Sequence, residues 1–173
     1  MKKLLILLSC LLMLVTANTC SAQMTLGVER LGEPQVQRML AHKRVGLFTN
    51  QSGVDSRLTS SVELVRAQAD LQAIFVPEHG LFGAVAAGDE VKGDEYAGIP
   101  VFSLYGDTRR PTQEMLSKID AMLVDIQDVG IRHYTYFSSL AYIMEECAKY
   151  QKEVIILDRP NPLGGKRVEG CLV

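Results

Sequence analysis

A glutamate and a histidine that stand directly after an apolar run are the residues best suited to acid–base chemistry. The run Ile74–Val76 is typical of a buried strand, and Pro77 and Gly80 then turn the backbone around Glu78 and His79. Partial desolvation raises the pKa of a carboxyl group and suits Glu78 to general acid catalysis; its structural alternative is a helix cap or an arginine pair. His79 is interpreted as a base, a ligand or an orienting donor, or as a structural partner of a loop carbonyl.

Four other strand-like runs also end in polar or aromatic residues. Loops that follow parallel strands meet at one edge of a sheet, with neighbouring strands about 4.8 Å apart, so these side chains are expected to surround one crevice. Carboxylates at three strand ends would repel one another unless they served a purpose. Besides Glu78 and His79, the candidates at these ends are Asn50, Tyr105, Asp125, Gln127, Asp128, Asp158, Arg159 and Asn161.

The residues after the fourth strand add a cation and phenols to these acids. In an extended chain Asp125 and Gln127 share one side, whereas Asp128 either lies on the rim or caps a turn. Arg132 and Tyr134 follow shortly afterwards. An arginine fork matches a carboxylate ligand with two hydrogen bonds, and its structural alternative is to neutralise the neighbouring aspartates.

The elements that must position these residues alternate between strand and helix. The sequence predicts strands over 44–48, 71–76, 99–104, 121–125 and 153–157. It predicts helices over 34–41, 61–69, 112–118 and 138–150, and a long excursion without regular structure over 84–97. This alternation indicates an α/β fold, a Rossmann-like parallel sheet of about five strands with helices on both faces.

The first residues predict export. Lys2 and Lys3 precede an apolar stretch over 4–15, and a small-residue cleavage site ends at Ala22, which is typical of a secretory signal peptide. We therefore interpret 1–22 as the signal and 23–173 as one mature domain that is periplasmic or secreted, without stable membrane insertion. Anchoring as a lipoprotein through Cys20 is less favoured, because Ala17 stands where a leucine is expected.

Composition argues against several classes of partner and cofactor. The 18 basic and 20 acidic residues are nearly balanced, without a basic stripe for nucleic acid. No glycine-rich phosphate loop predicts a nucleotide cofactor, and no cysteine–histidine spacing predicts a metal site. Cys147 is interpreted as a small buried helix residue rather than as a disulfide partner of Cys171, although pairing stays open.

Four ordered runs combine these candidates into a recognisable pattern: Pro-Glu-His-Gly at 77–80, Ser-Leu-Tyr-Gly at 103–106, the run 125–136 that begins Asp-Ile-Gln-Asp, and Leu-Asp-Arg-Pro-Asn-Pro at 157–162. The pattern resembles that of the NamZ-type exo-β-N-acetylmuramidases over essentially the whole mature chain. The resemblance implies a Rossmann-like catalytic domain followed by a smaller second domain, with the active cleft near their junction. The chain is expected to lack that second domain.

The resemblance also implies an activity. It points to a glycoside hydrolase, without a cofactor, that releases terminal N-acetylmuramic acid from the non-reducing ends of peptidoglycan fragments. Glu78 is then the acid catalyst, with His79 and Asp125 as further catalytic candidates. The second group is Asp125, Asp128 or the substrate's own acetamide. A lactyl carboxylate on the substrate would give Arg132 or Arg159 a partner. The other pocket residues that the resemblance implies are Asn50, Gln127, Tyr134, Asp158 and Asn161.

Two other functions fit the same residues. The first is a metal-dependent hydrolase of cell-wall amides or esters, in which Glu78, His79 and an aspartate hold a cation. The second is a non-catalytic module that binds muropeptides through the same edge of the sheet. Such a module would keep its arginine contacts and tolerate the substitution Glu78→Gln.

Overall fold

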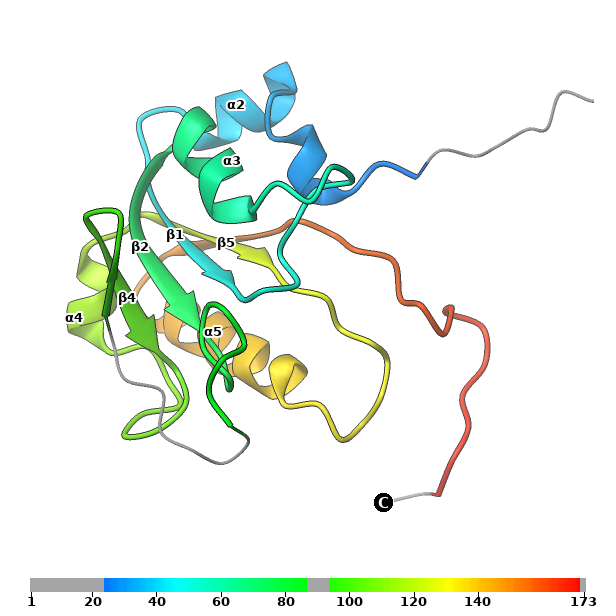
Figure 1. The fold of residues 1–173 in the computed structure, drawn as a ribbon. Helices are drawn as coiled ribbons and strands as arrows, with labels where there is room; N and C mark the ends of the chain where they lie inside the picture. The colour runs from blue at the N-terminus through cyan, green and yellow to red at the C-terminus, as the bar shows by residue number, and fades with distance from the viewer. Residues whose placement is uncertain (1–23, 87–93, 172–173) are drawn as a thin grey trace, which may run out of the picture.

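The computed structural model of the chain describes residues 24–86 and 94–171, so the predicted signal peptide lies outside the described residues. The fold has three layers, with one sheet between two layers of helices (Figure 1). The sheet has six strands in the order β3-β4-β2-β1-β5-β6. The predicted α/β fold with a mostly parallel sheet and helices on both faces is confirmed.

Five strands of the sheet pair in parallel, and a short sixth strand at one edge runs antiparallel to its neighbour. The parallel strands are β1 (Arg44–Thr49), β2 (Asp70–Val76), β4 (Ile99–Ser103), β5 (Ala121–Asp125) and β6 (Glu153–Ile156). Strand β3 (Asp94–Tyr96) pairs with β4 in the antiparallel direction. The central strands β1, β2 and β5 are apolar almost throughout, as expected of strands that are covered on both faces.

The helices divide between the two faces of the sheet. A 3-10 helix η1 (Gly27–Arg30) and the helices α2 (Pro34–Leu40) and α3 (Ser61–Gln68) cover one face. Helices α4 (Gln113–Ser117) and α5 (Tyr136–Lys149) cover the other (Figure 1). Helix α3 begins where predicted, because the Ser60 hydroxyl accepts a hydrogen bond from the Val62 amide at 3.2 Å.

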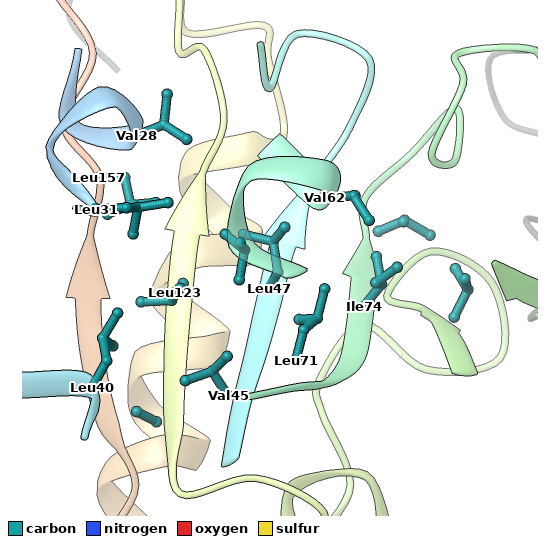
Figure 2. Close-up of a cluster of buried hydrophobic side chains, with 14 residues drawn as sticks. Val28, Leu31, Leu40, Val45, Leu47, Val62, Leu71, Ile74, Leu123 and Leu157 are labelled. Atoms are coloured by element: carbon teal, nitrogen blue, oxygen red, sulfur yellow. The ribbon is translucent and has the colours of Figure 1, made fainter. Parts of the chain in front are cut away.

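Each face of the sheet has its own hydrophobic core. On the first face Val45, Leu47 and Ile74 pack under α3, and the cluster reaches η1 through Val28 and Leu31 (Figure 2). On the second face the core is built around the fully buried side chains Phe48, Phe75, Leu116, Ile119, Met122, Ile143 and Cys147. The two cores hold the sheet from both sides, so the ends of its strands are fixed relative to one another.

The first helical turn is tied to the far end of the chain. The Gly27 amide donates to the Asp158 carbonyl at 2.9 Å. A Cβ on Gly27 would collide with the backbone at the junction of Leu157 and Asp158, so a side chain larger than hydrogen does not fit there. Leu157 lies in the same core cluster as Val28 and Leu31 (Figure 2).

Some boundaries differ from those predicted. The prediction of no regular structure over 84–97 is wrong for Asp94–Tyr96, which forms β3; residues 87–93 of that stretch lie outside the described residues. Helix α5 begins at Tyr136, two residues before the predicted start at Ser138. Cys147 is buried and Cys171 exposed, and both are free thiols, which agrees with the favoured interpretation of Cys147.

Among residues 24–86 and 94–171, no helix has the length and apolar character needed to cross a bilayer.

Candidate active site

The candidate residues gather at the carboxyl ends of two neighbouring strands whose following helices lie on opposite faces of the sheet. Strand β1 lies between β2 and β5, and Thr49 at its end pairs with Asp125 at the end of β5. The helix that follows β1 covers one face and the helix that follows β5 covers the other. In open α/β sheets this divergence is where ligands bind, beyond the carboxyl ends of the strands.

Glu78 lies half-buried on the loop after β2, between two hydroxyl groups. The Thr135 hydroxyl donates to Glu78 Oε2 at 3.3 Å. On the other side Tyr105, which follows β4, makes a hydrogen bond to the Glu78 carboxylate, and this bond is the main cause that raises the pKa of Tyr105. Residues from three separate loops therefore converge on the predicted acid catalyst.

Asn50 is buried at the end of β1, and one of its amide atoms lacks a partner. Its Oδ1 accepts hydrogen bonds from the Ser52 amide at 2.9 Å and the Ser52 hydroxyl at 2.6 Å, which fixes the orientation of the side chain. Among the described residues, its Nδ2 is a buried side-chain donor with no hydrogen-bond partner. An unpaired buried donor costs about 1–3 kcal/mol, so an acceptor that reached it would bind favourably.

Tyr136 lies beside this unpaired amide, at the first turn of α5. Burial is the main cause that raises the pKa of Tyr136, the neighbouring Tyr134 and Glu78 raise it further, and the Asn50 amide lowers it. The side chains of Asn50 and Glu78 thus both influence Tyr136. Tyr134 is 45% exposed, and its ring meets that of Tyr136 edge-on at 5.7 Å between centroids.

Asp125 is fully buried and engaged by Arg159. Arg159 Nε donates to Asp125 Oδ1 at 2.7 Å and Nη2 donates to Oδ2 at 2.9 Å, and Nη2 also donates to the Val54 carbonyl at 2.7 Å. Their side chains are 0% and 6% exposed. The pair therefore holds the loop after β6 against the ends of β1 and β5, and neither group is open to a ligand in this arrangement. The prediction that Asp125 acts in catalysis stays a prediction, and its geometry is that of a positioning residue.

His79 adopts a left-handed backbone conformation with φ of 73°. Its Nδ1 lies 2.8 Å from the Val85 carbonyl, which is the structural role that the sequence left open for this residue. If Nδ1 carries the proton and donates to that carbonyl, Nε2 is the acceptor of the neutral ring. The catalytic role of His79 stays a prediction.

Three further predicted residues connect neighbouring loops or fix the turns within them. Gln127 Nε2 donates to the Pro160 carbonyl at 2.9 Å, and the Gln127 amide donates to the Ser52 hydroxyl at 3.0 Å. Asp128 accepts from the Gly130 amide at 2.6 Å, so it does cap a turn, as one of its two interpretations proposed. Asn161 accepts from the Leu163 amide at 2.9 Å and packs closely on Gly130.

Arg132 points to a different neighbour from the one predicted. Its side chain is exposed, and Nη1 donates to the Cys171 carbonyl at 2.9 Å. No aspartate of the described chain pairs with it. Its predicted contact with substrate stays a prediction.

The predicted site residues line three small cavities rather than one. Asn50 lines a cavity of about 220 Å³ with Leu81, Phe82 and Tyr96, and His79 lines a second of about 210 Å³ with the same three residues. A third cavity of about 150 Å³ lies between β5, β6 and α5. It is lined by Asp128, Asp158 and Arg159 together with Tyr136 and apolar residues.

Three residues of the site were not assigned to it from the sequence, although Thr135 and Tyr136 were noted beside the acids of the run 125–136. Thr135 contacts Glu78, Tyr136 lies beside Asn50, and Ser52 orients Asn50. Thr135 and Tyr136 lie within the run 125–136, so their place in that motif is the signal that could have found them. Ser52 offered only its position two residues after a strand.

Within the described ranges, no group of three or more His, Cys, Asp or Glu residues lies close enough together to hold a metal ion. The set of Glu78, His79 and an aspartate that the metal-dependent alternative requires is therefore not assembled in these ranges.

Comparisons with known proteins agree with the fold and the motifs. Residues 45–173 match the family model described as exo-beta-N-acetylmuramidase NamZ, N-terminal. The chain is 46% identical over 144 residues to the peptidoglycan beta-N-acetylmuramidase NamZ of Bacillus subtilis (strain 168), an alignment that covers 81% of this chain and 35% of that protein.

Two crystal structures of DUF1343 family proteins from Bacteroides fragilis NCTC 9343 share the fold. The first has a TM-score of 0.75 and 47% identity over 84% of this chain and 37% of that one. The second has a TM-score of 0.65 and 34% identity, with 82% and 36% covered. The chain thus spans about a third of the length of these relatives. From the ordered motifs, the fold and these matches, the chain belongs to the NamZ family, of which it represents the N-terminal domain.

Proposed function

We propose that this chain forms the catalytic part of an exo-acting glycoside hydrolase that releases terminal N-acetylmuramic acid from peptidoglycan fragments. Membership of the NamZ family supports the reaction class, because the B. subtilis relative is named as a peptidoglycan β-N-acetylmuramidase. The observation that carries the assignment of the acid is the position of Glu78. It lies half-buried at the carboxyl edge of the sheet, with Tyr105 and Thr135 on its two sides.

In the proposed reaction Glu78 acts in its protonated form. It gives its proton to the glycosidic oxygen while the bond from that oxygen to the anomeric carbon breaks, and positive charge develops on the sugar ring. Water then adds to the anomeric carbon and gives its proton to the second catalytic group or back to the Glu78 carboxylate, so that the acid is restored for the next cycle. The hydroxyls of Tyr105 and Thr135 hold the Glu78 carboxyl in one orientation, which reduces the entropy that must be lost in the transition state.

Asn50 offers the substrate a hydrogen-bond donor next to the acid. Its Nδ2 is buried and makes no hydrogen bond within the described residues, and an oxygen of the sugar that accepted from it would satisfy the donor.

Three candidates exist for the second catalytic group: Asp125, Asp128 and the acetamide of the substrate itself. We favour the last two, because Arg159 occupies both carboxylate oxygens of Asp125. Asp128 lines the cavity between β5 and α5. Its substitution by Asn separates the two candidates, since a reaction assisted by the acetamide would keep most of its rate.

The test is release of N-acetylmuramic acid from the disaccharide N-acetylmuramyl-β-1,4-N-acetylglucosamine by the natural protein that contains this chain, because a sugar leaving group, unlike a nitrophenolate, needs the proton from the acid. The substitution Glu78→Gln is expected to lower kcat by about 10²- to 10⁴-fold, because it removes the proton donor. Glu63→Gln is the matched control, since Glu63 also accepts from a tyrosine, Tyr96, at 3.2 Å but lies on helix α3 rather than on the loop that carries Glu78. It is expected to leave kcat unchanged.

Any one of three results would overturn the proposal. Retained activity in Glu78→Gln would remove Glu78 from the role of acid. Cleavage of a muropeptide amide in place of the glycoside, abolished by a chelator, would favour the metal-dependent alternative, whereas binding of muropeptides with no cleavage at all would favour the binding module.

Export is a separate part of the proposal, supported by the pattern of the first 22 residues. The mature protein is expected in the periplasm or the medium with an N-terminus at Gln23. Mass spectrometry of the N-terminal peptide tests this, and a lipid-modified Cys20 would contradict it.

A further inference from the structure

The arginines near the site differ in how far their guanidinium groups are already occupied. Arg159 donates hydrogen bonds to the Asp125 carboxylate and the Val54 carbonyl, and Arg132 donates one to the Cys171 carbonyl. Arg109 instead lies over the ring of Tyr105, with its Cζ 5.6 Å from the ring centroid. Within the described part of the chain it makes no ion pair, and its side chain is exposed.

The platform under Arg109 belongs to the proposed active site. Tyr105 bonds through its hydroxyl to Glu78, so Arg109 lies one aromatic ring away from the proposed acid catalyst. A guanidinium that stacks on an aromatic face keeps the N–H groups along its edge free for a ligand. Stacking also restrains the side chain in advance, so less conformational entropy is lost when a ligand binds.

Arg110, the next residue in the chain, also lies over an aromatic ring, but its contacts are structural. Arg110 stacks on Tyr142 at 4.2 Å and pairs with Glu145 at 2.6 Å and with Glu146 at 3.3 Å. Its positive charge is thus matched by two carboxylates of α5. Arg109 also lies over an aromatic ring, at the longer distance of 5.6 Å, and no carboxylate of the described residues forms an ion pair with it.

We propose that Arg109 binds the lactyl carboxylate of the terminal N-acetylmuramic acid and thereby sets the preference of the site for muramic acid over N-acetylglucosamine. This inference rests on the proposed function. The two sugars differ in the lactyl ether on O3, whose carboxylate is ionised at neutral pH. C3 is two ring atoms from the anomeric carbon, so a cation one aromatic ring from the acid catalyst suits that substituent. A planar guanidinium fork binds a carboxylate with two hydrogen bonds.

The first experiment compares two ligands that differ in one charge. Isothermal titration calorimetry on the Glu78→Gln form of the natural protein measures binding of 4-nitrophenyl N-acetyl-β-muramide and of its lactyl methyl ester, which has nearly the same shape. The acid is expected to bind roughly 10- to 100-fold more tightly than the ester, as for a lost charge-assisted pair. Arg109→Met is expected to abolish this ratio by weakening the acid alone, and Arg110→Met is expected to preserve it.

Two further variants separate the platform from the acid catalyst. Tyr105→Phe keeps the ring under Arg109 but loses the hydroxyl on Glu78, so kcat is expected to fall while the ratio of acid to ester binding stays. Tyr105→Leu removes the stacking surface, so this ratio is expected to fall as well.

The variant Arg109→Lys keeps the charge without the planar fork, and it is expected to recover part of the preference for the acid over the ester.

The outcomes distinguish this inference from the proposed function. A ratio that Arg109→Met leaves unchanged, equal binding of acid and ester, or no binding of either overturns the role of Arg109. A ratio that Arg109→Met abolishes, together with no release of N-acetylmuramic acid by the parent protein, leaves carboxylate recognition in place and removes the hydrolase.

Discussion

Arg159 holds Asp125 through two parallel hydrogen bonds of 2.7 and 2.9 Å, in a place where both side chains are almost wholly removed from water. The same guanidinium also donates to the Val54 carbonyl. One side chain therefore connects the loop after β6, the end of β5 and the segment after β1. The loops that carry the candidate site depend on this contact for their relative positions.

Breaking this buried pair from one side is expected to be costly. Arg159→Met should lower the free energy of unfolding by about 3–5 kcal/mol, because it leaves the Asp125 carboxylate buried without a partner. Urea denaturation near pH 7 measures the change. The double variant Arg159→Met/Asp125→Leu should recover part of the loss, since it removes both charges. Arg30→Met, which breaks the exposed pair with Glu33, is the control and should change stability little.

The pair of Arg44 and Asp120 is expected to make stability depend on pH at the acidic end. Hydrogen bonds from the Arg44 side chain and then from its backbone amide lower the pKa of Asp120 from 3.8 to about 2. A carboxyl whose pKa is lower in the folded state stabilises it above the unfolded pKa and loses that effect as the pH falls toward 2. Both side chains are partly exposed, so Asp120→Asn should cost no more than about 1 kcal/mol near pH 7. The difference from the parent should vanish near pH 2 in urea titrations; an equal difference at both pH values would contradict this account.

A methyl group at Gly53 is expected to disturb the end of β1. A Cβ there would collide with the Thr49 hydroxyl and come within 2.6 Å of the Ser61 hydroxyl, and these two buried groups are hydrogen-bonded to each other at 3.0 Å. Gly53→Ala should therefore lower the free energy of unfolding by about 1–3 kcal/mol, as overpacking does elsewhere. Thermal unfolding measures it. Gly165→Ala is the matched control, because nothing lies within 4 Å of its added Cβ; a similar loss in both variants would count against the collision.

The two thiols of the mature domain are expected to differ sharply in reactivity. Burial is the main cause that raises the pKa of Cys147 to about 11, so its thiol stays protonated at neutral pH, whereas Cys171 is exposed. A thiol reagent near pH 8, followed by peptide mapping, should modify Cys171 in the native protein and Cys147 only after denaturation. Rapid labelling of both thiols in the native protein would contradict the burial of Cys147.

The sheet was predictable because its central strands are short apolar runs closed by turn residues. The five parallel strands from β1 to β6 follow directly from that pattern. Strand β3 was missed because Asp94–Tyr96 is short and polar, and it exists only through its pairing with β4. Helix α5 starts earlier than expected because Tyr136 packs its ring inward at the first turn, a tertiary effect that periodicity does not report.

For the candidate site, the sequence identified residue types and their edge of the sheet but not their partners. It placed Glu78 where Tyr105 and Thr135 meet it. It could not show that Arg159 would pair with Asp125, since the two residues lie 34 positions apart and either side chain could have faced a ligand. For the same reason Arg109 did not emerge as a candidate, because its significance comes from the ring beneath it.

The contact between Gly27 and Asp158 has a consequence for maturation of the protein. The predicted cleavage after Ala22 leaves a leader of only a few residues before the Gly27 amide that holds the Asp158 carbonyl. Proteolytic trimming beyond that glycine would remove this bond and then the Val28 side chain from the core. The accuracy with which the new amino terminus is generated thus bears on the loop that carries Arg159, which lies far along the sequence.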